Sequence, residues 1–153
     1  SFDYGVKTIY GIRYGYAGLT PRGNQEPLLL GPDEVDTIHE IGGTILGSAR
    51  GQQPTEDIVE TLMRMNINVL FCIGGDGSLR CARDIAEMCL ARRLSISVVG
   101  VPKTIDNDLQ FVGPSFGFET AFVEATNVIR SAHAEAKGTM NGVGLVKLEE
   151  MQK

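Results

Sequence analysis

Two short polar stretches contain the residue types that could perform chemistry. The first is Gly74-Gly75-Asp76-Gly77-Ser78, and the second is residues 102–108, Pro-Lys-Thr-Ile-Asp-Asn-Asp. Glycines let a backbone close around a phosphate, and the second stretch adds two carboxylates, a hydroxyl and an ammonium group. Together the stretches offer a phosphate cradle, metal ligands, a cation and a base, which are the groups that phosphoryl transfer requires. The sequence therefore predicts phosphoryl-transfer machinery.

Each stretch follows an apolar run that is typical of a buried strand, residues 68–73 before the first and 95–101 before the second. Hydrophobic spacing and Gly or Pro boundaries predict the remaining elements. We expect further strands at 6–12, 28–30, 44–46 and 143–147, a helical turn at 14–19, and helices at 32–41, 54–65, from the glycine-rich turn to 92, and at 116–137.

Strands and helices alternate at intervals of 25 to 30 residues. This alternation predicts an α/β fold in three layers, with a mostly parallel sheet and helices on both of its faces. Ligands bind such sheets beyond the carboxyl ends of the strands. Arg50, Asp76 and Asp106 all follow predicted strands, so we expect them to meet at one edge of the sheet.

The acidic residues indicate a metal. A carboxylate among phosphate-facing glycines would repel the ligand unless a cation lay between them, so we interpret Asp76 as a Mg²⁺ ligand. Of Asp106 and Asp108, one could hold the metal while the other takes a proton from an incoming hydroxyl. The alternative is a loop in which these Asx side chains only cap the backbone.

Two basic residues are candidates for phosphate contact. Arg50 follows a predicted strand and is flanked by small residues, which suits a phosphate clamp, although an ordinary surface arginine would look the same. Lys103 could serve the transferred phosphate or form a salt bridge with Asp106 or Asp108.

Composition excludes several classes of function. The net charge of −5 argues against nucleic acid as the main partner. The sequence has no apolar run long enough for a membrane span and no signal-peptide pattern. Cys72, Cys81 and Cys89 lack the spacing of a zinc site, and free thiols favour a reducing, cytoplasmic location.

Four motifs resemble the phosphofructokinase family in order and spacing: GTILGSARG at 43–51, IGGDGS at 73–78, GVPKTIDND at 100–108 and FGFETA at 116–121. The resemblance implies that ATP, as Mg-ATP, gives its terminal phosphoryl group to the 1-hydroxyl of fructose 6-phosphate. It implies that Asp106 is the catalytic base, with Arg50 and Lys103 also in catalysis. The other implied roles are sugar-side binding by Thr104 and Asp108, donor binding by Arg50, Gly75, Asp76, Gly77 and Ser78, and Mg²⁺ binding by Asp76 and Asp108.

The resemblance leaves two phosphoryl donors to weigh. In the family a glycine after the GGD aspartate goes with ATP, whereas an aspartate there goes with pyrophosphate, so Gly77 favours ATP. Lys103 is typical of pyrophosphate-dependent enzymes, but an ATP-dependent subgroup of plant-like and trypanosomatid enzymes also has PKTIDND. Because the surrounding sequence resembles that subgroup, ATP is our prediction and pyrophosphate the alternative.

The sequence also departs from the family's pattern. Cys81 stands where a glycine is usual, and Glu149-Glu150 stand where Met-Gly-Arg is expected. We expect residues 1–153 to form a single α/β domain, the nucleotide and Mg²⁺ half of an enzyme truncated at both ends, without its sugar-phosphate domain. The full-length family member is expected to be a homo-dimer or tetramer. A non-catalytic nucleotide-binding or assembly module is the alternative that these departures leave open.

Overall fold

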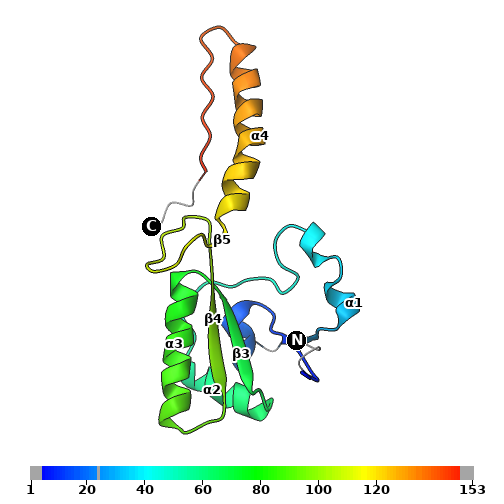
Figure 1. Cartoon of the computed structure of the whole chain (residues 1–153), viewed down its shortest axis with the longest axis vertical. Coiled ribbons are helices and arrows are strands. Elements are labelled where there is room, and N and C mark those ends of the chain that lie inside the picture. Colours follow the sequence, from blue (N-terminus) through cyan, green and yellow to red (C-terminus); the bar gives the residue numbers. More distant parts are fainter. Residues whose placement is uncertain (1–4, 24, 149–153) are drawn as a thin grey trace. The chain divides into compact units, whose positions relative to one another are not determined.

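The computed structural model describes residues 5–23 and 25–148. Glu149, where the sequence departs from the family's pattern, lies outside these residues. The chain, whose helices and strands are labelled in Figure 1, divides into two compact units. One unit comprises the residues up to 70 together with 83–97, and the other comprises 71–82 together with the residues from 98 onward. Each unit is described by itself.

A three-stranded sheet positions both polar stretches. Its strands are β3 (Val69–Gly74), β4 (Ser97–Thr104) and β5 (Phe116–Gly117), in the order β3-β4-β5. The helix α3 (Asp76–Ala91) connects β3 to β4, and β4 pairs with β5 in parallel. The predicted α/β class with a mostly parallel sheet is confirmed, although the sequence did not predict the short strand β5.

Two helices carry most of the buried side chains of the first unit. In α2 (Thr55–Arg64) the spacing of Ile58, Leu62 and Met65 predicts one buried face, and Ile58 and Leu62 are fully buried. In the second half of α3 the sequence predicts Ile85, Met88 and Cys89 to face inward, and Ile85 and Cys89 are buried. The predicted helical turn is the 3₁₀ helix η2 (Gly15–Leu19), and it packs against α2.

The predicted strands near the N-terminus are short in the structure. Of residues 6–12 only β1 (Tyr10–Gly11) is a strand, and it pairs antiparallel with β2 (Leu28–Leu29). The predicted strand at 44–46 is wrong. The Thr44 hydroxyl accepts a hydrogen bond from the Leu46 amide at 3.1 Å, and the Thr44 carbonyl accepts one from the Gly47 amide at 3.2 Å. These bonds make a turn, which uses the groups that a strand would need for its ladder.

The predicted helix at 32–41 is broken. The structure has α1 (Pro32–Val35) and the 3₁₀ helix η3 (Ile38–Glu40), and Thr37 between them has the non-helical ψ of 2°. Asp36 and Thr37 are poor helix formers, because their side chains compete for backbone hydrogen bonds and Thr is β-branched. The spacing of Val35, Ile38 and Ile41 predicts one apolar face for this helix, but all three side chains are exposed.

The longest helix is α4 (Phe118–Lys137), close to its predicted bounds of 116–137. Spacing predicts one packed face made of Phe118, Phe122, Ala125, Ile129 and Ala132. Of these only Ala125 is buried, and Phe122 and Ile129 are about half exposed. Phe118 and Phe122 meet edge to face, with ring centroids 5.6 Å apart. Within the described residues, no helix has the length and apolar character needed to cross a membrane.

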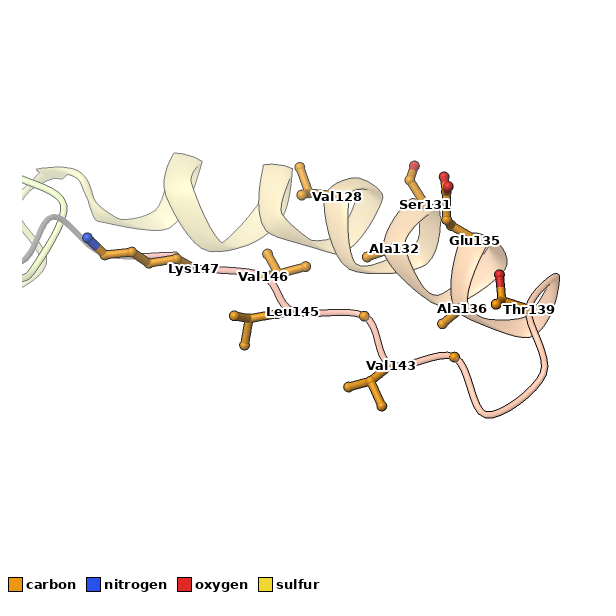
Figure 2. Close-up of a pocket in the computed structure, with 12 residues that line it drawn as sticks. Val128, Ser131, Ala132, Glu135, Ala136, Thr139, Val143, Leu145, Val146 and Lys147 are labelled. Atoms are coloured by element: carbon orange, nitrogen blue, oxygen red, sulfur yellow. The ribbon is translucent and has the colours of Figure 1, made fainter.

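The predicted strand at 143–147 is also wrong, because the segment is extended without being a strand. It follows the C-terminal half of α4, and a Cβ added at Gly144 would lie 2.9 Å from the Ala132 carbonyl oxygen. Figure 2 shows Val146 turned toward the helix and Val143 and Leu145 turned away from it, where both are more than 90% exposed. The segment and the helix line an open groove that contains none of the predicted site residues.

Candidate active site

The glycine-rich stretch is a turn between a strand and a helix, as predicted. Gly74 ends β3 and Asp76 begins α3, so the turn leads into the N-terminus of a 16-residue helix. A Cβ added at Gly74 would clash with the Ser78 side chain, so this position admits only glycine without a shift. Helix N-termini attract phosphate through unpaired amides and the helix dipole.

The surroundings of this turn are open at Gly77. A Cβ added at Gly77 would meet no heavy atom within 4 Å, so the backbone there can approach a ligand closely. The Asp76 side chain is 57% exposed, and its Oδ2 lies 2.9 Å from Nε of Arg80 one helical turn later. This ion pair leaves the carboxylate accessible from the solvent side.

The second stretch begins in β4 and is organised around Thr104, the last residue of that strand. The Thr104 hydroxyl accepts a hydrogen bond from the Asp106 amide at 3.2 Å. It also donates a longer bond, 3.4 Å, to Oδ1 of Asp108. One hydroxyl therefore holds the backbone of one acidic residue and the carboxylate of the other.

Asp106 is half-buried, and its Oδ1 is an unusual atom. This oxygen is shielded from solvent, and within the described part of the chain it has no hydrogen-bond partner. Leaving a buried acceptor unsatisfied costs about 1 to 3 kcal/mol. A donor supplied by a ligand, such as a hydroxyl group, would satisfy it, and a proton acceptor must lie within hydrogen-bond reach of the group it deprotonates.

The two stretches approach each other at the ends of neighbouring strands. A Cβ added at Gly75 would lie 3.6 Å from the Lys103 carbonyl oxygen, which is ordinary van der Waals contact. The two stretches therefore lie close together at Gly75 and the end of β4, while the predicted meeting of Asp76 and Asp106 stays a prediction. The Lys103 side chain is exposed on β4, opposite Phe116 of β5.

Arg50 belongs to the other compact unit, in an exposed loop that follows the turn at 44–47. Its predicted place beside Asp76 and Asp106 stays a prediction. Arg50 does not follow a strand as expected, because residues 44–46 form a turn.

The donor set suits Mg²⁺ held largely by a ligand. Among the described residues, no three His, Cys, Asp or Glu side chains gather into a metal site. Mg²⁺ commonly binds one or two carboxylates together with waters and substrate phosphates. Asp76, at the glycine-rich turn, and Asp108 fit that mode, so the residues present are compatible with the predicted metal.

Sequence reasoning missed two residues that hold the second stretch, Asn107 and Ser115. The Ser115 amide donates to Oδ1 of Asn107 at 2.9 Å, and its hydroxyl donates to the Thr104 carbonyl at 2.7 Å. Asn107 lies inside the recognised motif, and its positive φ of 51° is a conformation that asparagine tolerates. A lone serine eleven residues from Thr104 gave no comparable signal.

Comparison with known families agrees with the motifs. The sequence model of the family described as Phosphofructokinase matches residues 1–149. A protein of Borreliella burgdorferi named ATP-dependent 6-phosphofructokinase is 53% identical over 145 residues, which are 95% of this chain and 32% of that protein. A protein of Trypanosoma brucei brucei with the same name is 50% identical, over 95% of this chain and 30% of that protein.

A solved structure supports the fold. The structure of Pichia pastoris phosphofructokinase in the T-state superposes with a TM-score of 0.75 at 24% identity, covering 87% of this chain and 16% of that one. At that identity the match bears on the fold alone. This chain spans about a third of the length of the two curated relatives.

Proposed function

Because this chain belongs to the phosphofructokinase family, we propose that it forms the donor and metal side of an ATP-dependent 6-phosphofructokinase active site. The reaction moves the terminal phosphoryl group of Mg-ATP to the 1-hydroxyl of fructose 6-phosphate. One observation carries the proposal: the glycine-rich turn meets the end of β4, whose loop holds Asp106 with an unsatisfied, buried carboxylate oxygen.

Asp106 is the base in this proposal. Its Oδ1 accepts a hydrogen bond from the 1-hydroxyl of the sugar and then takes the proton. At the same time the hydroxyl oxygen of the sugar forms a bond to the γ-phosphorus. The bond from the γ-phosphorus to the β,γ-bridging oxygen breaks, ADP leaves, and Asp106 later returns the proton to solvent. Phosphoryl transfer depends mainly on such positioning and on charge stabilisation.

The donor binds across the glycine-rich turn. Gly75, Gly77 and Ser78 present backbone and hydroxyl groups to the phosphates at the N-terminus of α3. A bound Mg²⁺ would neutralise charge on the donor phosphates, and Asp76 and Asp108 are the residues that would hold it.

The remaining polar groups contact the transferred phosphate and the sugar. Lys103 and Arg50 stabilise negative charge on the phosphoryl group as it moves. Thr104 orients the sugar side of the site, and its hydroxyl also fixes Asp106 and Asp108.

Lys103 favours a second candidate, a pyrophosphate-dependent phosphofructokinase. A lysine at the end of β4 could take the place of nucleotide contacts in binding a smaller donor. Gly77 weighs against this candidate, because its open surroundings leave room for a nucleotide. The two donors are separated by direct assay. We also propose that the whole enzyme is a cytoplasmic homo-oligomer.

The test uses the complete protein that carries this sequence. Turnover of fructose 6-phosphate is measured with ATP and with pyrophosphate, for the unmodified protein and for Asp106→Asn. Asp33→Asn, an exposed carboxylate in α1, is the matched control. We expect ATP to support turnover, Asp106→Asn to lower kcat by about 10²- to 10⁴-fold, and Asp33→Asn to change nothing.

Each contrary result identifies a different error. Turnover with pyrophosphate only would replace ATP by the second candidate. A folded protein inactive with both donors would remove the proposed reaction. An Asp106→Asn variant that kept more than a tenth of kcat would remove the base assignment alone.

A further inference from the structure

The acidic loop leaves the sheet and returns to it at the same place. It starts after Thr104, the last residue of β4, and ends before Phe116, the first residue of β5. Because β4 and β5 pair in parallel, with Thr104 opposite Gly117, residues 105–115 form a closed loop on one strand end. Whatever ties the two ends of the loop together also limits where Asp106 and Asp108 can lie.

Ser115 ties those ends together. Among the described residues it is one of the few polar ones that are buried, with 6% of its surface exposed. Its hydroxyl donates to the Thr104 carbonyl at 2.7 Å, and its amide donates to Oδ1 of Asn107 at 2.9 Å. Both donors of this one residue therefore point back to the start of the loop.

The two acceptors lie on either side of Asp106. Thr104 is two residues before it and also binds the Asp106 amide through its hydroxyl. Asn107 is the next residue, in the left-handed backbone region with φ of 51°. A non-glycine residue in this region persists where its surroundings hold it, and here the Ser115 amide binds its side chain.

We propose that Ser115 is the positioning residue that fixes Asp106 for proton transfer, a role that rests on the proposed function. Without the Ser115 hydroxyl, the Thr104 carbonyl loses its hydrogen-bond donor. The loop then loses one of the two hydrogen bonds, here called cross-links, that Ser115 makes to the start of the loop. Misplacing a catalytic group by about 1 Å can cost about 100-fold in rate. The loss should therefore appear in kcat more than in the binding of the donor.

The test compares three variants of the complete protein. Ser115→Ala removes the hydroxyl, and Ser115→Thr keeps it. Ser131→Ala is the matched control, because the Ser131 hydroxyl also donates to a backbone carbonyl, that of Asn127 at 3.0 Å, but on the exposed surface of α4. We measure kcat, the KM for each substrate, and hydrogen–deuterium exchange of the amides at 105–115.

We expect Ser115→Ala to lower kcat about 10- to 100-fold with the KM for ATP within about twofold. Amide exchange in the loop should speed up, Ser115→Thr should restore both readouts, and Ser131→Ala should change neither. The proposal is overturned if Ser115→Ala keeps kcat within twofold, if only KM changes, or if threonine and alanine are equally impaired.

Two measures keep the result clear. If Ser115→Ala does not fold, Asn107→Ala removes the other cross-link and must show the same loss of kcat and the same faster exchange. Amide exchange does not depend on the reaction. A protein that fails to phosphorylate fructose 6-phosphate therefore removes the proposed function, while unchanged exchange in Ser115→Ala removes the role of Ser115.

Discussion

Arg80 holds Asp76, with its Nε 2.9 Å from the carboxylate Oδ2, one turn along α3. The residue that we propose for Mg²⁺ therefore has a competing cation within its own helix. Both side chains are more than half exposed, and exposed ion pairs at this spacing contribute only about 0.3 to 0.5 kcal/mol. The pair is weak enough for a bound metal to displace it.

Arg80→Gln should therefore raise the affinity of the complete protein for Mg²⁺ with a non-hydrolysable ATP analogue by about twofold. The reason is that Asp76 no longer has to break its ion pair with Arg80 before it binds Mg²⁺. Calorimetric titration measures the affinity, and Arg83→Gln, which breaks the ion pair with Asp84 in the same helix, is the control. Weaker binding in Arg80→Gln alone would show instead that the guanidinium contacts the donor.

The sequence predicted those parts of the site that depend on neighbours in the chain. The β3 strand, the glycine turn and α3 follow one another within 25 residues, and each has a local signature in hydrophobicity or glycine. The same holds for β4 and its acidic loop. Their meeting at Gly75 and Lys103 follows from parallel strands sharing an edge.

What could not be predicted depends on distant or missing partners. No sequence pattern near Ser115 predicts that it forms hydrogen bonds with Thr104 and Asn107. The run at 143–147 has strand-like composition, but a strand requires a neighbouring strand, and in the described chain this segment lies along α4. At 44–46 the strand propensity of Thr-Ile-Leu was outweighed by the hydrogen bonds of Thr44.

Ile85 should dominate the stability of its part of the core, since it is fully buried in α3. Ile85→Ala should lower the free energy of unfolding by about 2 to 5 kcal/mol, from lost burial and the cavity left behind. Leu90→Ala, at a position 77% exposed in the same helix, should cost less than about 0.5 kcal/mol. Urea denaturation of the two variants checks the difference, and equal losses would contradict this assignment of the core.

Burial raises the pKa of the Cys89 thiol, and nearby Arg92 only partly opposes the shift. A group whose pKa is higher in the folded state contributes fully to the free energy of unfolding at pH values below its unfolded pKa, which is about 8.5 for a thiol. This contribution is lost as pH rises through the folded pKa. The free energy of unfolding should thus fall as pH rises above the unfolded pKa of about 8.5, and Cys89→Ala should make that fall shallower. Urea denaturation across this range measures both slopes, and identical slopes would show that the thiol is not responsible.

Gly77→Asp should change the choice of donor without changing the fold. A side chain there meets no heavy atom within 4 Å, so the new carboxylate would extend into the space above the turn where the nucleotide is proposed to lie. The new side chain would take up space that the nucleotide needs, and its charge would repel the donor phosphates at a cost of several kcal/mol, so kcat/KM for ATP should fall about tenfold or more. Pyrophosphate, which has no nucleoside to accommodate, should be affected less.

Steady-state kinetics with both donors test this expectation. Gly42→Asp is the matched control, because it adds the same charge at another glycine with open surroundings, far from the turn in sequence. Gly77→Ala separates bulk from charge and should leave most of the ATP activity. An equal loss with both donors, or no loss with ATP, would mean that the nucleotide does not pass over Gly77, and the donor would then have to reach Asp106 from another side of the loop.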